Sequence, residues 1–476
     1  MTNAAARQIL TRGSKCGEIW RSETLKMSQN ERLLARSRFV GSTDFLNEVK
    51  SVLLKNNRRG LLRCVELLQL RRLMNPVDAM RILAVTPEKK TGDKSRRPDF
   101  EQEVAALTEI GVVRWAEALV LRWTKENEKI QSEVNALSQR LRQDAVLCRI
   151  LCDTLTRQNI LGWHQGEMPS IEKPYTLFSG QVFSAYSFSY LAPLKYSKKG
   201  EAKPQPTPAL IDCWGEVVSI HHIQSFQDRL LRVSEAASEK RRILPVFAAI
   251  GFSHEAWQLA KQSGYLVVNV SQLLGQTAIE TISTIEALIS KVSYVDGEEI
   301  ESRASRIADM MDALKENPIV TSLRSIGFEI MAGLALRSLS HEGVCIGKLV
   351  PWKETERDID AFGFQGDNLT VIECKANVRD NCPRDYEIRK FFTESVPALK
   401  KWLRTQRTIN RCKAELWTTG TVTSEAQQLV EALQPKKGND KYSIRSLREM
   451  QQEFPVSIRN RIMQLGDAIS LGGSNE

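Results

Sequence analysis

An internal repeat is the feature of this sequence that most constrains its fold. The segment ALIDCWG (209 to 215) matches RDIDAFG (357 to 363), which aligns Asp212 with Asp360 in an Ile-Asp-small-aromatic-Gly pattern. A β-rich run, a helix, a strand and a helix with hydroxyl-x-Glu-Ala-x-Gln-Leu follow each segment in the same order. Self-similarity that keeps this order predicts one α/β unit present in two copies.

The later segments of the two copies also correspond one to one. The β-rich runs are EVVSIHHI and LTVIECKA, and the helices after them are SFQDRLLRVSEAASEK and YEIRKFFTESVPALKKWLRTQR. The next strands are LPVFAAIG (244 to 251) and AELWTTG (414 to 420), followed by the helices SHEAWQL and TSEAQQL. A last strand, YLVVNVSQLL or KYSIRSLREM, completes each copy.

The second copy places opposite charges on one face of a strand. Side chains alternate along a strand, so Glu373 and Lys375 share a face with Leu369 and Val371. Asp360, at the end of the preceding strand, is expected to reach the same point. Two carboxylates can hold Mg²⁺ or Mn²⁺, and a lysine can orient a water and offset charge on a phosphate. This set of groups suits phosphodiester hydrolysis.

The order Asp360, then Glu373-x-Lys375 thirteen residues later, resembles the PD-(D/E)xK superfamily of restriction-endonuclease-like nucleases. Ile359 stands in place of the proline. The segment PIVTSLRSIGFEIMAGLALRSLSHEG (318 to 343) looks like the first helix of that superfamily, and Glu329 would be its additional active-site glutamate. VCIGKLVPW (344 to 352) would be the first strand, and AELWTTGTVTSEAQQL is similar to Mrr-type members. The resemblance covers roughly residues 318 to 450.

The resemblance implies a role for each residue of this set. Asp360, Glu373 and Glu329 would be metal ligands as well as catalytic residues, Lys375 would be catalytic, and the cofactor would be Mg²⁺ or Mn²⁺. Asp358 rivals Asp360, because the two lie on one face of the strand, but the repeat aligns Asp358 with Leu210 and therefore favours Asp360. The alternative interpretation is that Glu373 and Lys375 form an ion pair on a solvated sheet face.

The first copy lacks these charges. Aligned through the repeat, Ser219 stands where Glu373 is and His221 where Lys375 is, while Asp212 is kept. Serine is a poor Mg²⁺ ligand, so this copy is predicted not to cut. A histidine-based site formed by His221 and Asp212 is the alternative.

The N-terminal part is basic and helical in pattern. Residues 1 to 123 carry 23 Lys and Arg against 14 Asp and Glu, so most of the net charge of +10 lies there and suggests a polyanionic partner. Residues 1 to 55 read as helical. Three helices (59 to 74, 75 to 85, 99 to 111) and the hairpin VVRW and ALVLRW then resemble a winged helix. Its third helix is acidic, so DNA contact is expected from a basic loop, namely Lys89, Lys90, Lys94, Arg96 and Arg97.

These patterns predict an α/β protein with two tandem restriction-endonuclease-like domains, each a mixed sheet flanked by helices, preceded by a helical, winged-helix-like module. The expected divisions are the basic module at 1–123, a connecting helix at 124–160, a degenerate nuclease-like domain at 161–275, a helical connector at 276–316 and an active nuclease domain at 317–476. A composition 42% hydrophobic and 26% charged, with no long apolar run and no secretory signal, predicts a cytoplasmic chain without membrane spans.

The expected function is that of a metal-dependent DNA endonuclease, suited to restriction or antiviral defence. RNA is the alternative substrate, and a non-catalytic nucleic-acid-binding or scaffold protein is the rival function. A third interpretation, an effector gated by a small molecule, would need a phosphate-binding Gly-rich loop in residues 160 to 275, and none is evident. Expected partners are DNA, a second copy of the chain or a protein of a larger defence complex, and any ATP-driven partner would be another chain, since no GxxxxGK[ST] motif is present.

Overall fold

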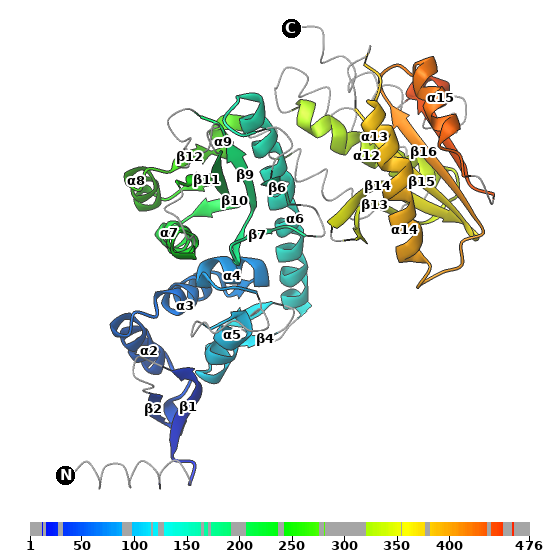
Figure 1. Cartoon of the computed structure of the whole chain (residues 1–476). Coiled ribbons are helices and arrows are strands. Elements are labelled where there is room, and N and C mark those ends of the chain that lie inside the picture. The colour runs from blue at the N-terminus through cyan, green and yellow to red at the C-terminus, as the bar shows by residue number, and fades with distance from the viewer. Residues whose placement is uncertain are drawn as a thin grey trace. The chain divides into compact units, whose positions relative to one another are not determined.

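A computed structural model shows a mixed α/β protein that divides into two compact units (Figure 1). Unit 1 comprises residues 1–144, 156–169 and 175–270, and unit 2 comprises residues 145–155, 170–174 and 271–476. The structure describes residues 12, 16–26, 32–87, 98–115, 118–121, 128–162, 166–169, 173–191, 206–236, 242–275, 280, 320–353, 355–376, 381–435, 439–450 and 459–460. Within these ranges, no helix is both long enough and apolar enough to cross a membrane.

Unit 1 begins with a β-hairpin. Strand β1 (Ile19–Lys26) pairs antiparallel with β2 (Arg32–Arg36). The helical prediction for residues 1 to 55 is therefore wrong over these strands. Trp20 of β1 packs edge-on against Phe45, and this tertiary contact overrides the weak helical propensity of the segment. Helix α2 (Thr43–Lys55) follows, with the side chain of Ser42 as its N-cap.

The next elements alternate helices with short strands. They are α3 (Arg59–Arg71), β3 (Leu73–Met74), α4 (Pro76–Leu83), α5 (Phe100–Glu109), β4 (Val113–Trp115) and β5 (Leu119–Leu121). The strands form one sheet of order β3-β5-β4. Asn75 and Asp99, the first residues of the predicted helices 75 to 85 and 99 to 111, cap α4 and α5 through their side chains, as the residue types Asn and Asp before a helix predict.

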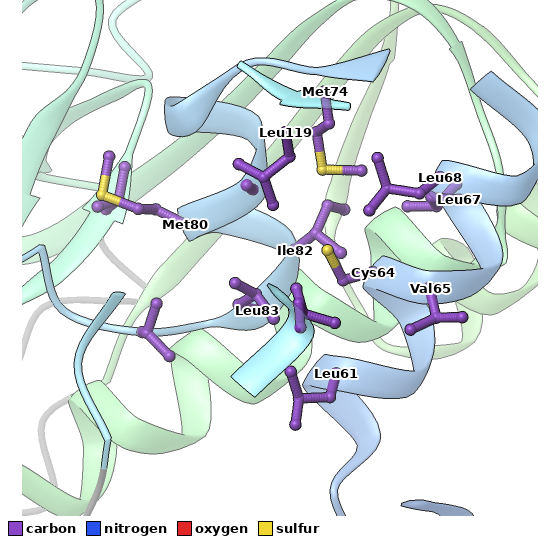
Figure 2. Packing of buried hydrophobic residues seen from close by; sticks show 14 of the residues in the cluster. Leu61, Cys64, Val65, Leu67, Leu68, Met74, Met80, Ile82, Leu83 and Leu119 are labelled. Atoms are coloured by element: carbon purple, nitrogen blue, oxygen red, sulfur yellow. The ribbon is translucent and has the colours of Figure 1, made fainter. Parts of the chain in front are cut away.

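Helices α3 and α4 pack through a cluster of aliphatic side chains. Figure 2 shows Cys64 and Leu68 of α3 beside Ile82 of α4, with Met74 and Leu119 of the small sheet at one side. All of these side chains are buried. The same core continues to Phe226, in the helix Ile220–Ala236, and to Phe247, in the larger sheet of unit 1, so residues from the predicted segments 1–123 and 161–275 share one core.

Gly60 allows the close approach of α3 to α4. A Cβ at this position would lie 2.5 Å from the backbone carbonyl oxygen of Leu83, which cannot move without displacing α4. We expect Gly60→Ala to lower the free energy of unfolding by about 1–3 kcal/mol, the usual cost of overpacking. Urea denaturation measures this, and Arg59→Ala, at an exposed position of the same helix, is the control. An alanine variant as stable as the wild type would contradict this packing argument.

The connecting helix predicted at 124–160 is observed as α6 (Glu128–Arg157). A five-stranded sheet then completes unit 1, formed by β6 (Gly166–Glu167), β9 (Ala185–Ser189), β10 (Thr207–Val218), β11 (Leu244–Phe252) and β12 (Leu266–Asn269). Its order is β12-β11-β10-β9-β6. Helix α7 (Ile220–Ala236) joins β10 to β11, α8 (His254–Gln262) joins β11 to β12, and α9 (Val270–Leu274) follows β12. A separate hairpin pairs β7 (Thr176–Phe178) with β8 (Gln181–Phe183).

Unit 2 contains a second five-stranded sheet. After helix α12 (Val320–Ser338) come β13 (Glu342–Trp352), β14 (Thr355–Gln365) and β15 (Asn368–Lys375). The crossover consists of α13 (Asp385–Lys390), a π-helical turn η4 (Phe391–Ser395) and α14 (Val396–Leu403). The remaining elements are β16 (Arg411–Thr418), α15 (Ser424–Ala432), β17 (Lys441–Ser446) and α16 (Leu447–Met450). The sheet order is β13-β14-β15-β16-β17.

The two sheets have the same sequence of strand directions. In each, the first three strands pair antiparallel and the last two join by parallel pairing. The predicted helices SHEAWQL and TSEAQQL are confirmed as the starts of α8 and α15, capped by Ser253 and Thr423. Of the predicted connector 276–316, only residue 280 lies within the described residues.

The predicted alignment of Asp212 with Asp360 is wrong. Asp212 lies in β10, the third strand of its sheet, whereas Asp360 lies in β14, the second strand of the other. The predicted strand EVVSIHHI does not exist as such, because β10 runs without a break to Val218 and α7 begins at Ile220. His221 is consequently a helical residue rather than the strand counterpart of Lys375.

Candidate active site

The register of β14 against β15 determines which charged residues face each other. The last paired residues are Ala361 and Ile372, so Asp360 and Glu373 come next in register, with Asp358 and Lys375 two residues further along their strands. Opposed residues of an antiparallel pair project from the same face of the sheet. These four side chains therefore belong to one face.

Along that face, apolar pairs give way to charged ones. Phe364 opposes Leu369 and Phe362 opposes Val371, and all four side chains belong to the core beneath α13 and α14. The next residues of this face in each strand are the charged ones, Asp360 and Asp358 in β14 and Glu373 and Lys375 in β15. A strand pair that buried its whole face would continue the apolar pattern, so the change marks the point where the core ends and a polar site begins.

Hydrogen bonds fix part of this charged end. Lys375 Nζ donates to Glu373 Oε1 at 2.7 Å, and the backbone N–H of Cys374 donates to Asp360 Oδ2 at 2.6 Å. The Glu373 side chain is only 14% exposed, yet its Oε2 is buried and has no hydrogen-bond partner. An unpartnered carboxylate oxygen is costly to bury, which indicates a position for a ligand.

Helix α12 adds Glu329 to this group. The pKa of Glu329 is raised to about 7, mainly by burial and also by the negative charges of Asp358 and Glu373, while Arg149 and Lys375 lower it. Burial, together with Glu373 and Glu329, also raises the pKa of Asp360 well above its ordinary value. The negative charges of these carboxylates therefore act on one another.

The site has two cationic groups. Burial lowers the pKa of Lys375, but the negative charges of Glu373 and Asp360 more than offset this and raise it above the ordinary value. Arg149, in the part of α6 that belongs to unit 2, behaves in the same way beside Glu329, Asp358 and other carboxylates. Arg149 was not predicted from the sequence, since it lies far upstream in an unremarkable helical pattern.

The structure thus brings together the predicted residues Glu329, Asp360, Glu373 and Lys375. The rival, Asp358, belongs to the same group but is exposed and lies further from the end of the β14–β15 pairing than Asp360. The nucleic-acid-binding residues predicted in the basic loop, Lys89, Lys90, Lys94, Arg96 and Arg97, lie outside the described residues.

The donor chemistry fits a divalent cation, although the ligand set is not fully assembled. Carboxylate oxygens are the preferred ligands of Mg²⁺ and Mn²⁺, and the unpartnered Oε2 of Glu373 is available to one. Across the described ranges, however, no group of three or more His, Cys, Asp or Glu side chains is arranged to hold a metal ion. Asp360 and Glu373 are the two carboxylates best placed to provide the first ligands.

Comparison with known proteins adds no relative: no family model matches the chain, and neither a curated protein nor a solved structure is significantly similar to it.

The raised pKa of Glu329 predicts how stability depends on pH. Its stabilising contribution is complete below pH 4.5, the ordinary pKa, and is lost as the pH rises to about 7, because the unfolded chain then releases its proton more readily. This corresponds to about 3 kcal/mol at most. We expect Glu329→Gln to avoid this loss, so that urea denaturation of the metal-free protein finds the variant more stable than the wild type at pH 8.

At pH 4, where Glu329 is protonated in both the folded and the unfolded wild type, the difference in stability between Glu329→Gln and the wild type should disappear. Glu431→Gln, at an exposed position of α15, controls for the general effect of removing a carboxylate. A Glu329→Gln variant that is less stable than the wild type at pH 8 would contradict the placement of this carboxylate in a crowded acidic site.

Proposed function

We propose that unit 2 is a metal-dependent nuclease domain of the PD-(D/E)xK type and that the protein is an endonuclease acting on DNA. The observation that carries this proposal is the charged end of the β14–β15 pair. There, Asp360 stands opposite Glu373, and Lys375 lies two residues after Glu373 on the same strand. The buried Oε2 of Glu373 has no hydrogen-bond partner. The order α12, three antiparallel strands, crossover and parallel strands also agrees with the expected order of elements.

In this proposal each residue has a distinct part. Asp360 and Glu373 would hold a Mg²⁺ or Mn²⁺ ion, which when bound supplies positive charge at the phosphate and lowers the pKa of a water. Lys375 stays protonated, because the carboxylates beside it raise its pKa, and so it donates N–H groups and positive charge rather than accepting a proton. The apolar pairs Phe362–Val371 and Phe364–Leu369 keep these strands rigid behind the site.

DNA as substrate is supported by the N-terminal module, whose order of elements resembles a winged helix. Two of the three acidic residues of α5, which would repel phosphates, are engaged by other groups of the protein, whereas Glu101 is exposed. Glu109 accepts hydrogen bonds from the backbone N–H groups of Thr24 and Leu25 at 2.8 and 3.1 Å, and Glu103 pairs with Arg58 at 2.7 Å. Phosphate contact is therefore assigned to basic residues outside α5, as the sequence suggested.

A non-catalytic nucleic-acid-binding role is the second candidate. The Lys375–Glu373 ion pair and the lack of a complete three-ligand group among the described residues favour it. In such a protein the charged end of the sheet would be a self-neutralising surface, and metal would have no effect on it.

Cleavage assays separate the two candidates. The full chain is incubated with supercoiled plasmid, linear duplex, single-stranded DNA and RNA, with Mg²⁺ or Mn²⁺ and with EDTA. We expect nicked and linear plasmid with either metal and none with EDTA. Metal-independent binding without cleavage of any substrate would favour the non-catalytic role, and cleavage of RNA alone would reassign the substrate.

A further inference from the structure

The sheet of unit 1 reproduces the local geometry of the candidate active site at other residues than the repeat alignment indicated. The last paired residues of β9 and β10 are Ala185 and Ile211, so Ser184 stands opposite Asp212. In unit 2 the last pair is again an alanine with an isoleucine, and Asp360 stands opposite Glu373.

A hydrogen bond repeats with the register. The backbone N–H of Cys213 donates to Ser184 Oγ at 2.9 Å, just as the N–H of Cys374 donates to Asp360 Oδ2. The aligned segments are then Ile211-Asp212-Cys213-Trp214 with Ile372-Glu373-Cys374-Lys375, and SAYSF (184 to 188) with DAFGF (360 to 364).

The neighbouring parallel strands support the same alignment independently. Asp212 stands beside Phe247 of β11, and Phe247 precedes Gly251 by four residues. In the same way, Glu373 stands beside Leu416 of β16, and Leu416 precedes Gly420 by four residues. The alignment therefore places Ser184, Asp212 and Trp214 where unit 2 has Asp360, Glu373 and Lys375.

In unit 1 this position is occupied by arginines of the chain itself. Arg229 of α7 binds Asp212 with both terminal nitrogens, at 3.1 and 2.5 Å, and Nη2 of Arg81 of α4 lies 3.1 Å from Asp212 Oδ1. Arg81 also donates to the carbonyl oxygen of Cys213 at 3.0 Å. Its guanidinium lies 3.5 Å from the ring centre of Trp214. Asp212 and Arg229 are 0% exposed, and Arg81 is 2% exposed.

We propose that unit 1 contains a closed copy of the site, in which the guanidinium of Arg81 takes the place that the metal ion would occupy in unit 2. Instead of binding metal, this closed copy binds Arg81 and thereby holds α4 of the N-terminal module against β10. Trp214 stands in the position of Lys375 and provides an aromatic face for Arg81. Ser184 stands in the position of Asp360, so the closed copy has one carboxylate fewer. The comparison with a metal site rests on the proposed function of unit 2, whereas the docking rests on the contacts of Arg81 alone.

Further ion pairs extend the dock. Asp78, next to Arg81 on the same face of α4, is bound by Arg140 of α6 at 2.6 Å, and Arg140 also pairs with Glu216 at 3.0 Å. Asp144 of α6 accepts the backbone N–H of Gly215 at 2.9 Å. The end of β10 is thus held by α4, α6 and α7, and the carboxylate of Asp212 has no access to solvent.

Metal binding tests the closed state without any cleavage assay. Titration calorimetry of the full chain with MnCl₂ is compared for the wild type, Glu373→Gln and Asp212→Asn. We expect Glu373→Gln to abolish Mn²⁺ binding at micromolar concentrations and Asp212→Asn to leave its stoichiometry unchanged. Binding that survives Glu373→Gln but is lost in Asp212→Asn would overturn the proposal.

Hydrogen exchange tests the docking, and its outcome does not depend on nuclease activity. In Arg81→Met, the amides of residues 76–83 and of 207–218 should exchange at least tenfold faster than in the wild type, while those of β15 should not change. Arg58→Met, which removes a partly exposed partner of Glu103, should leave residues 207–218 unaffected. If Arg81→Met does not fold, Arg81→Lys, which keeps the charge, replaces it and should show a smaller increase. Unchanged exchange in both segments would refute the docking role.

Discussion

Replacing Lys375 by alanine should lower the rate of DNA cleavage about a thousandfold, because the variant loses a fixed cation at the position where negative charge develops. The measurement is the initial rate of plasmid nicking at saturating Mg²⁺. The fold should survive, since the lysine side chain is 24% exposed and its pairing with Glu373 is not part of the core.

The chain offers a matched control for this substitution. Lys413 pairs with Glu415 at 2.9 Å, two residues along the adjacent strand β16, which repeats the spacing of Lys375 and Glu373. Glu415 stands beside Ile372 and therefore projects from the opposite face of the sheet. Lys413→Ala should cut at about the wild-type rate, since the Lys413 side chain is 47% exposed and Glu415 keeps Arg445 at 3.6 Å and the indole N–H of Trp417 at 3.0 Å as partners. Equal rates for Lys375→Ala and the wild type would remove the assignment of this site.

Replacing Asp212 by alanine should destabilise unit 1 by about 3–5 kcal/mol, because two buried arginines would lose their counter-charge. Chemical denaturation followed through tryptophan fluorescence should report this, since Trp214 is fully buried beside the cluster. Asp228→Ala is the control: it removes the partner of Arg63 from α7, but the Asp228 side chain is 30% exposed, so water can reach the site and a smaller loss than in Asp212→Ala is expected.

The two variants separate the roles of the corresponding carboxylates. Asp212→Ala should weaken the fold without a direct effect on the chemistry of unit 2, whereas Glu373→Ala should stop cleavage and leave unit 1 intact. If Asp212→Ala is as stable as Asp228→Ala, the buried arginines must be compensated in another way, and the closed copy would lose its structural role.

The candidate site of unit 2 could be predicted from the sequence because its signal is local. Alternation along one strand places Glu373 and Lys375 together, and Asp360 lies in the adjacent strand of the same hairpin, so few assumptions were needed. The helix caps at Asn75 and Asp99 were equally accessible, since capping depends on neighbouring residues.

The correspondence within unit 1 could not be obtained in the same way. The shared Ile-Asp-small-aromatic-Gly pattern aligned Asp212 with Asp360, whereas the position of each strand in its sheet aligns Asp212 with Glu373. Only the sheet register distinguishes these alignments, and register depends on partners distant in the sequence. The roles of Arg81 and Arg149 were not predicted for a related reason. Each arginine interacts with carboxylates that are distant in the sequence and that only tertiary packing brings close to it.

The connection between the second and third strands of each sheet has a practical consequence. In unit 2, β14 and β15 are joined by Gly366 and Asp367 alone, whereas in unit 1 the corresponding strands are joined by residues 190–206, and yet both pairs end in the same alanine–isoleucine register. Strand pairing, rather than turn length, therefore sets which carboxylates meet. A flexible insertion at the Gly366–Asp367 turn should therefore leave the pairing of β14 with β15 intact at a small cost in loop-closure entropy, together with the hydrogen bonds that this turn accepts from Arg407 and Asn410.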